Sequence, residues 1–193
     1  MNTDLIIVFL YSYLIGSIPF GLIITKLFLK SDIRKIGSGN IGATNVLRTG
    51  KKSLAASTLL FDVSKGYLSI YLTQIYFNDL VYLTAISCFI GHIFPVWLNF
   101  KGGKGIATYL GIILCLSFEL AIVFGVTWLI IFFIFRYSSL SSIVSTLIVL
   151  AYSNFLRNYD LSTYLFTAFV IVLYTHRKNI IKLKNKKENK IKF

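Results

Sequence analysis

Long, nearly unbroken apolar runs are the feature that most limits what this chain can fold into. They cover Leu5–Thr25, Leu80–Phe100, Ile106–Phe135 and Leu161–Thr175. A soluble domain interrupts its apolar positions at the period of a helix or strand, whereas a membrane-spanning helix needs about 20 apolar residues in a row. The chain is 56% hydrophobic over 193 residues. The sequence therefore predicts an all-α, polytopic transmembrane helix bundle in which residues 1–193 form a single membrane domain.

The longest apolar run leaves two arrangements open. Ile106–Phe135 carries Glu119 near its middle. It is either one over-long helix or two short helices that turn at Ser117-Phe118-Glu119, and this choice changes the number of spans from six to seven.

The distribution of charge favours seven spans. With seven spans and the N-terminus outside, the basic loops and the basic tail 177–193 lie in the cytoplasm, Lys65 lies within a span, and Arg157 alone among the 20 Lys and Arg residues lies outside. Six spans would move Arg136 and the tail outside, against the excess of Lys and Arg in cytoplasmic loops. We therefore expect a multi-pass membrane protein with its N-terminus outside and a cytoplasmic C-terminus.

The net charge of +13 does not indicate a nucleic-acid partner. The basic residues lie in short loops that flank apolar runs, and they form no continuous stripe with interleaved aromatic residues. The tail is expected to rest on anionic lipid headgroups. Cys88 and Cys115 lie within apolar runs without metal-ligand spacing, so no metal site and no cofactor are expected. The N-terminus lacks the cationic leader of a cleaved signal peptide, so the first run is read as a retained span.

Two glycine-rich, basic segments carry the features of a phosphate site. The first contains Ser38, Gly39, Asn40, Asn45 and Arg48, and the second is Lys101-Gly102-Gly103-Lys104-Gly105. Glycine lets backbone N–H groups approach an anion, and Arg or Lys supplies charge. Each segment could instead be a polar turn whose cations only set the topology. Under the seven-span topology both segments face the cytoplasm, which favours a shared site.

Two further polar groups fall on the same predicted face. Arg136–Ser142 combines a cation with hydroxyls, although a serine at a helix start is often only an N-cap. His176 and Asn179 share one helix face. A lone interfacial histidine is more often structural than catalytic, and the same holds for His92.

Asp62 and Lys65 are opposite charges placed three residues apart within an apolar segment. Buried charges in membranes pair with one another and often serve function. A structural brace is the first interpretation and substrate positioning the second. No serine elbow and no Cys–His pair is apparent, so any chemistry should be direct transfer between two bound substrates.

These residues closely resemble a known family, the bacterial acyl-phosphate-dependent glycerol-3-phosphate acyltransferases. The matching segments are 16–21, 37–48, 62–66, 91–108, 136–142 and 176–180. The tail departs from the Arg-Leu-Leu-x-Gly-x-Glu ending that is common in relatives, because it reads Lys182-Leu183-Lys184-Asn185.

The resemblance implies a seven-helix enzyme of the bacterial inner (plasma) membrane with its active site at the cytoplasmic face. It implies transfer of a fatty acyl group from acyl phosphate to the 1-hydroxyl of sn-glycerol 3-phosphate, giving lysophosphatidic acid and phosphate, which is the first acylation of phospholipid biosynthesis. It implies catalytic roles for Ser38, Arg48, Lys104, His176 and Asn179. It implies substrate-phosphate binding by Gly39, Asn40, Asn45, Lys101, Gly102, Gly103, Gly105 and Ser141. The general base stays open between His176 and a substrate phosphate.

Two other classes of protein fit this sequence less well. A transporter of phosphorylated metabolites would show two related halves with matched helix interruptions near the middle of the membrane, and no such repeat is apparent. A non-catalytic membrane scaffold would explain the apolar runs but not the two glycine-rich cationic segments.

Overall fold

The computed structural model describes residues 2–191, and among these residues it contains helices and turns but no strand. The predicted all-α fold is therefore confirmed for the described part of the chain. The chain forms two compact units, Met1–Leu116 and Ser117–Phe193.

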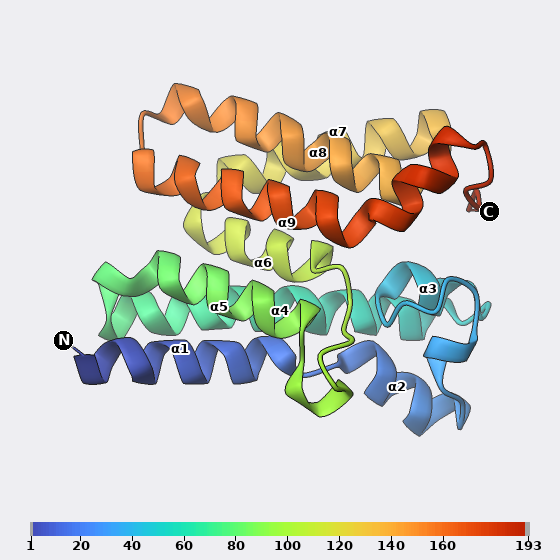
Figure 1. Cartoon of the computed structure of the whole chain (residues 1–193), viewed down its shortest axis with the longest axis horizontal. Coiled ribbons are helices and arrows are strands. Elements are labelled where there is room, and N and C mark those ends of the chain that lie inside the picture. The colour runs from blue at the N-terminus through green and yellow to red at the C-terminus, as the bar shows by residue number, and fades with distance from the viewer. Residues whose placement is uncertain (1, 192–193) are drawn as a thin grey trace. The chain divides into compact units, whose positions relative to one another are not determined.

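The first unit is built on two pairs of closely packed helices. It contains α1 (Asn2–Ser17), α2 (Phe20–Leu29), α3 (Ala43–Leu47), α4 (Lys52–Tyr76), α5 (Val81–Ile93) and α6 (Ile106–Leu116), with 3-10 turns at Ile33–Lys35, Asn78–Leu80 and Val96–Leu98. α1 packs on α5, and α4 packs on α6 (Figure 1). A Cβ atom added to Gly111 of α6 would lie 1.9 Å from the Val63 carbonyl oxygen of α4. Small residues thus bring these backbones into direct contact, as is common between membrane helices.

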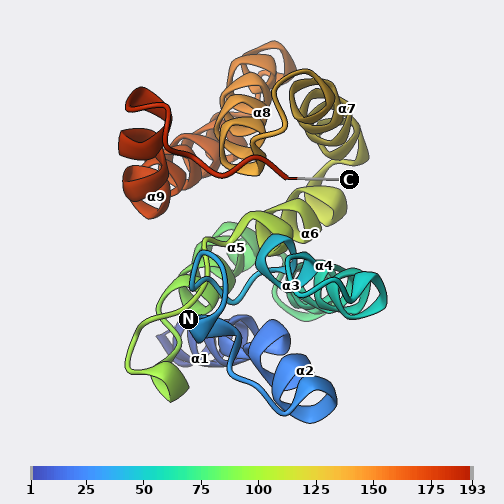
Figure 2. The same cartoon turned by 90° about the vertical axis from the view of Figure 1, so that its right-hand side faces the viewer.

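The second unit is a three-helix layer. It contains α7 (Phe118–Phe135), α8 (Ser138–Ser153) and α9 (Tyr159–Lys184), with a 3-10 turn at Asn154–Leu156. α8 packs against both α7 and α9, as the end-on view in Figure 2 shows. α7 ends at Phe135, and the capping residue Arg136 has φ 63° in the left-handed region, so the chain reverses directly into α8.

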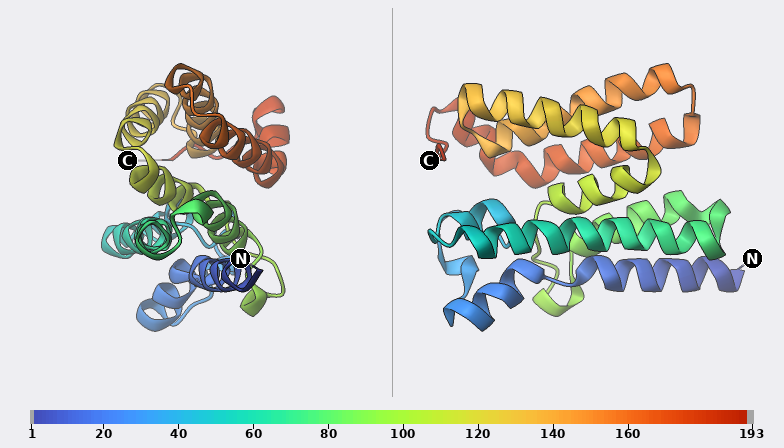
Figure 3. Two further views of the ribbon diagram at one scale, coloured as in Figure 1. Left: turned by 90° about the vertical axis from the view of Figure 1, so that its left-hand side faces the viewer. Right: turned by 180° about the vertical axis from the view of Figure 1, so that it is seen from behind.

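The first apolar run is interrupted, which its composition did not predict. α1 ends at Ser17 and α2 begins at Phe20, and the right-hand view in Figure 3 shows the bend between them. Pro19 has no N–H to donate to the preceding turn and disfavours helical geometry at Ile18. The break leaves the carbonyl group of Ile18 available to a side chain of the unit.

Four segments are long and apolar enough to cross a membrane, within the described residues. They are Thr3–Leu29, Asn78–Leu98, Phe118–Phe135 and Ser138–Leu156. α6 is apolar but shorter, and α4 and α9 are long but carry charged residues. The run from 106 to 135 forms two helices that meet at Ser117, whose Oγ accepts a hydrogen bond from the N–H of Leu120 at 3.4 Å. Seven spans and their direction stay predictions.

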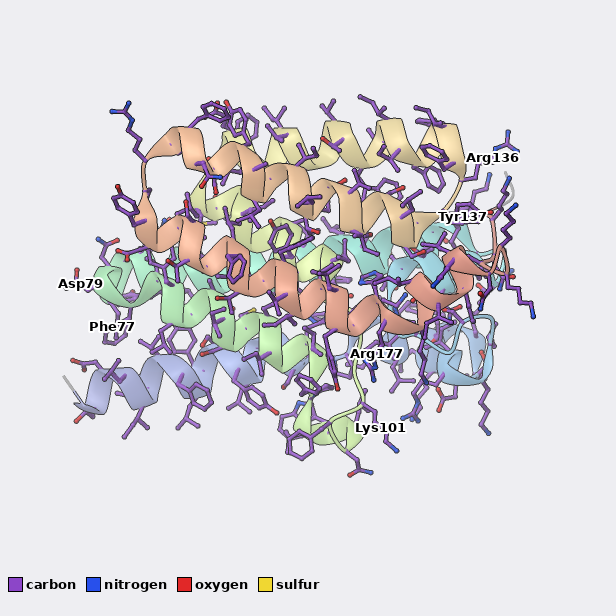
Figure 4. The ribbon with its side chains drawn as sticks, turned by 45° about the horizontal axis from the view of Figure 1, so that its top comes forward. Phe77, Asp79, Lys101, Arg136, Tyr137 and Arg177 are labelled. Atoms are coloured by element: carbon purple, nitrogen blue, oxygen red, sulfur yellow. The ribbon has the colours of Figure 1, made fainter. Side chains whose placement is uncertain are left out.

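Helix α9 continues beyond the last apolar run. It ends at Lys184, so the first part of the basic tail is helical. Within the first unit, Figure 4 labels Asp79 at the turn between α4 and α5, while Lys101 follows the opposite end of α5. The second glycine-rich segment therefore lies at the end of α5 away from the Asp79 turn.

Candidate active site

The side chain of Asn45 organises the first glycine-rich segment. Its Nδ2 donates to the carbonyl oxygens of Ile33, Ile36 and Asn40 at 3.1, 2.9 and 2.8 Å. Its Oδ1 accepts from the N–H of Ser38 at 2.9 Å. The residue is 2% exposed, so its amide is engaged by the loop itself. Asn45 fixes the backbone that carries Ser38.

Arg48 follows the short helix α3 and passes close to Gly37. Gly37 has φ 57°, and a Cβ atom there would lie 2.4 Å from Oδ1 of Asn45 and 3.0 Å from Cδ of Arg48. A glycine is therefore required beside the Arg48 side chain, on both conformational and steric grounds. Ser38 and Gly39 are exposed, and Asn40 and Arg48 are half-buried.

The two arginines near this segment differ in their partners. Arg34 forms an ion pair with Asp32 at 2.6 Å, and the hydrogen bond from Arg34 lowers the pKa of Asp32 to about 2. Arg48 has no ion pair with any residue from 2 to 191. Its guanidinium therefore keeps its charge available for an anion.

The second glycine-rich segment folds back onto the end of α5. The N–H groups of Gly102 and Gly103 donate to the carbonyl oxygens of Ile93 and His92 at 3.0 and 3.1 Å. These two amides are occupied by protein, so a phosphate here would draw backbone donors from the first turn of α6, whose N–H groups lack intrahelical partners. Lys101 is exposed and Lys104 is half-buried beside that turn.

Gly105 joins this segment to α6 and cannot carry a side chain. Its φ is 85°, and a Cβ atom would lie 2.1 Å from Cε2 of Phe89. Gly105 thus allows α6 to begin directly after Lys104.

One apolar cluster supports both glycine-rich segments. Its buried members are Leu22, Ile33, Ile41, Val46 and Ala55, and Leu98 packs against them. Ile41 and Val46 belong to the first segment, and Leu98 lies just before the second. Both segments are therefore anchored on a common core within the first unit.

The charges predicted to pair within the membrane do so. Nζ of Lys65 lies 2.8 Å from Oδ1 of Asp62, and both side chains are 2% exposed. The same ammonium donates to the Ile18 carbonyl at 2.8 Å and lies 2.9 Å from Nδ1 of His92. The break after α1 therefore supplies one ligand of a buried charge cluster. His92, first read as a structural residue, is part of this cluster.

After Arg136, the hydroxyls of Ser141 and Ser142 donate hydrogen bonds to backbone carbonyl oxygens four residues earlier. Oγ of Ser141 donates to the Tyr137 carbonyl at 3.0 Å, and Oγ of Ser142 donates to the Ser138 carbonyl at 2.8 Å. Ser141 is fully buried. Neither hydroxyl donates to a histidine, so neither has the partner that activates a serine nucleophile.

His176 and Asn179 are held in fixed orientations on α9. Nδ1 of His176 lies 2.9 Å from the Val172 carbonyl oxygen, so Nδ1 carries a proton. In the neutral ring, Nε2 is then the nitrogen able to accept one. Nδ2 of Asn179 donates to Oε1 of Glu188 at 2.7 Å.

Glu188 is the residue that the sequence argument missed. Its Oε1 also accepts from Oγ of Ser139 at 3.0 Å. It is the one acidic residue in the basic tail 177–193, and that isolation is the signal that could have identified it.

The predicted site residues thus fall into two groups. The first unit contains the two glycine-rich segments with Ser38, Arg48, Lys101 and Lys104, and the second unit contains Ser141, His176 and Asn179, of which Asn179 contacts Glu188 of the tail. Among residues 2–191 no group of three or more His, Cys, Asp or Glu side chains could hold a metal ion.

Known proteins match this chain over nearly its whole length. The family model described as glycerol-3-phosphate acyltransferase matches residues 6–186. A protein of Pelagibacter ubique named glycerol-3-phosphate acyltransferase is 51% identical over 189 residues, covering 98% of each chain. One of the same name from Mesorhizobium japonicum is 46% identical, covering 99% of this chain and 98% of the relative.

Solved structures agree with this result. The crystal structure of PlsY (YgiH), described as an integral membrane glycerol 3-phosphate acyltransferase in its glycerol 3-phosphate form, matches with a TM-score of 0.93 and 32% identity, covering 98% of this chain and 96% of that one. A second structure of PlsY, the lysphosphatidic acid form, matches with a TM-score of 0.90. The chain therefore belongs to the glycerol-3-phosphate acyltransferase family, whose members are integral membrane acyltransferases of phospholipid biosynthesis.

Proposed function

We propose that this protein transfers a fatty acyl group from acyl phosphate to the 1-hydroxyl of sn-glycerol 3-phosphate. The hydroxyl oxygen attacks the acyl carbonyl carbon, the bond from that carbon to the phosphate oxygen breaks, and phosphate leaves. The products are lysophosphatidic acid and inorganic phosphate. The solved relative in glycerol 3-phosphate and lysphosphatidic acid forms supports this choice of acceptor and product.

The observation that carries the proposal is the anchoring of two cationic, glycine-rich segments on one apolar cluster. Arg48 and Lys101 have no ion pair among the described residues, and α6 begins directly after Lys104 and Gly105. A reaction between two phosphorylated substrates needs several positive groups and helix N–H donors at one place. The two segments and the start of α6 support the proposal because they carry groups of this kind.

The roles of the site residues follow from their chemistry. Arg48, Lys101 and Lys104 bind phosphate oxygens and balance the charge of the leaving group. Ser38, the backbone at Gly39 and Asn40, and Ser141 orient the acceptor. Gly102, Gly103 and Gly105 shape the second segment, and Asn45 shapes the first.

The transfer proceeds without a covalent acyl-enzyme. An acyl phosphate already carries a good leaving group, and the hydroxyls of Ser141 and Ser142 are bonded to backbone carbonyls. The proton of the attacking hydroxyl goes to Nε2 of His176 or to a substrate phosphate. Asn179 orients the acceptor beside that base.

We further propose that residues 1–193 act as one membrane domain of seven spans in the bacterial inner membrane. The N-terminus lies outside, the active site lies at the cytoplasmic face, and residues 177–193 form a cytoplasmic basic tail. Charge distribution supports this direction, because it leaves Arg157 as the one basic residue outside.

The test uses detergent-purified protein with glycerol 3-phosphate and palmitoyl phosphate. Phosphate release and lysophosphatidic acid formation are followed together, and palmitoyl-CoA replaces palmitoyl phosphate in a parallel reaction. We expect equal amounts of both products from palmitoyl phosphate and none from palmitoyl-CoA. Activity with palmitoyl-CoA alone would contradict the donor, and correctly folded protein without activity on either donor would contradict the proposed reaction.

A further inference from the structure

The buried ammonium of Lys65 lies between three polar groups. A lysine ammonium has three N–H donors and no acceptor. Its partners here are Oδ1 of Asp62 at 2.8 Å, the Ile18 carbonyl at 2.8 Å and Nδ1 of His92 at 2.9 Å. The ammonium therefore donates to the Ile18 carbonyl, lies against a ring nitrogen and forms an ion pair with Asp62.

This arrangement fixes the protonation of the His92 ring. Nδ1 can accept from an ammonium only when it carries no proton. The ring is then neutral with its proton on Nε2. Lys65, held by Asp62 and the Ile18 carbonyl, thus makes His92 an Nε2–H donor.

The Nε2–H group faces the second glycine-rich segment. A Cβ atom built on Gly103 would lie 2.1 Å from Nε2 of His92, so a side chain there would cover this nitrogen. His92 is 4% exposed. No hydrogen bond joins Nε2 to another described residue, and Nε2 is not among the fully buried side-chain atoms that lack a partner, so part of it reaches the molecular surface. The donor is therefore held in one orientation beside Gly103, and only a residue without a side chain at position 103 leaves part of it accessible.

We propose that Nε2–H of His92 donates to a phosphate oxygen of a substrate bound at residues 101–105, and that Asp62 and Lys65 are positioning residues that hold the ring in this donor form. The inference rests on the proposed function, since it assigns one more contact to the same phosphate site. It also explains why opposite charges are buried beside that site. The group that accepts this hydrogen bond is a phosphate oxygen, which belongs either to the acyl phosphate or to glycerol 3-phosphate.

The protonation state can be measured without turnover. The chain has two histidines, so nitrogen-15 histidine labelling of the wild-type protein in detergent gives two pairs of imidazole nitrogen signals, and the His92→Gln variant identifies the pair from His92. We expect proton-bearing Nε2 and bare Nδ1, with the Nε2 signal moving on titration with inorganic phosphate or glycerol 3-phosphate. A proton on Nδ1, or an Nε2 signal unchanged at saturating concentrations of both ligands, would overturn the proposal.

Two variants distinguish the loss of the Nε2–H donor from a general loss of folding. His92→Asn keeps an acceptor near Nδ1 for Lys65 but removes the donor toward Gly103, whereas His92→Gln carries an amide N–H near the place of Nε2. We expect His92→Asn to raise the KM of one substrate by about 10- to 100-fold, the loss typical of a hydrogen bond to a charged group. His92→Gln should recover most of that loss, and neither change should alter kcat as strongly.

The substrate whose KM rises identifies the source of the phosphate. A rise for palmitoyl phosphate assigns the contact to the donor, and a rise for glycerol 3-phosphate assigns it to the acceptor. Unchanged values for both substrates in a folded His92→Asn protein would overturn the proposal. Should palmitoyl phosphate fail as a donor altogether, the proposed function is contradicted, while the nitrogen-15 titration still decides the role of His92.

Discussion

Asn179 on α9 donates a 2.7 Å hydrogen bond from Nδ2 to Oε1 of Glu188, a residue that lies beyond the end of the helix. The same oxygen accepts from Oγ of Ser139 in the first turn of α8 at 3.0 Å. The chain after α9 is further fixed where the N–H of Ile191 donates to the Arg136 carbonyl at 3.0 Å. A carboxylate in the tail therefore joins α8, α9 and a candidate catalytic amide.

Glu188→Ala should lower both stability and activity. It leaves two polar side chains without their shared acceptor, and hydrogen bonds to a charged group contribute about 1.5–3 kcal/mol. We expect a clear fall in the thermal midpoint in detergent and roughly a tenfold or greater fall in kcat/KM as Asn179 loses its orientation. Glu188→Gln is the matched control, since its carbonyl oxygen can still accept. A Glu188→Ala protein with wild-type stability would show that this contact is unimportant.

Asn45 should tolerate no isosteric replacement. Its amide donates to three carbonyl oxygens and accepts from the N–H of Ser38. Asn45→Asp keeps the shape but turns a carboxylate toward those carbonyls, so it should destabilise the first segment at least as much as Asn45→Ala, by about 1–3 kcal/mol or more. Thermal unfolding and the KM for glycerol 3-phosphate measure the effect. Wild-type behaviour of Asn45→Asp would contradict the structural role assigned to the amide.

Arg48→Ala and Lys104→Ala should nearly abolish turnover and leave membrane insertion intact. Each removes a charge-assisted phosphate contact of about 1.5–3 kcal/mol, or about one to two decades in rate or affinity. Initial rates with both substrates measure the loss. Arg34→Ala is the matched control, because Arg34 is exposed and already paired with Asp32. Equal rates in Arg48→Ala and Arg34→Ala would remove Arg48 from the site.

Much of this fold could be predicted because apolar length and charge are local properties of the sequence. The all-helical class follows from the apolar runs, and the break at Ser117 coincides with a polar interruption in the longest run. The pairing of Asp62 with Lys65 could be predicted because a charge buried in a membrane needs a partner.

Other features depend on contacts between distant residues. The bond from Lys65 to Ile18 joins positions far apart in the chain, and so does the approach of Nζ to His92. Pattern and spacing do not show which carbonyl a helix break exposes. For the same reason, the position of Asn45 in a glycine-rich loop predicts a phosphate ligand, whereas its side-chain amide forms hydrogen bonds with the backbone of that loop.

The seven-span topology makes a prediction that separates it from six spans. Single cysteines at Phe118, Asp160 and Asn189 would be introduced into a Cys88→Ala, Cys115→Ala background, and all three positions are exposed. Seven spans place the first two outside and the third in the cytoplasm, because the run from 106 to 135 then crosses the membrane twice. A membrane-impermeant maleimide should therefore label Phe118→Cys and Asp160→Cys in intact cells, and Asn189→Cys after lysis alone. With one long helix in place of α6 and α7, Phe118 would lie in the bilayer and resist labelling, while Asn189→Cys would react in intact cells. That pattern would reverse the C-terminal half of the topology and move the basic tail outside, away from the anionic headgroups it is expected to contact.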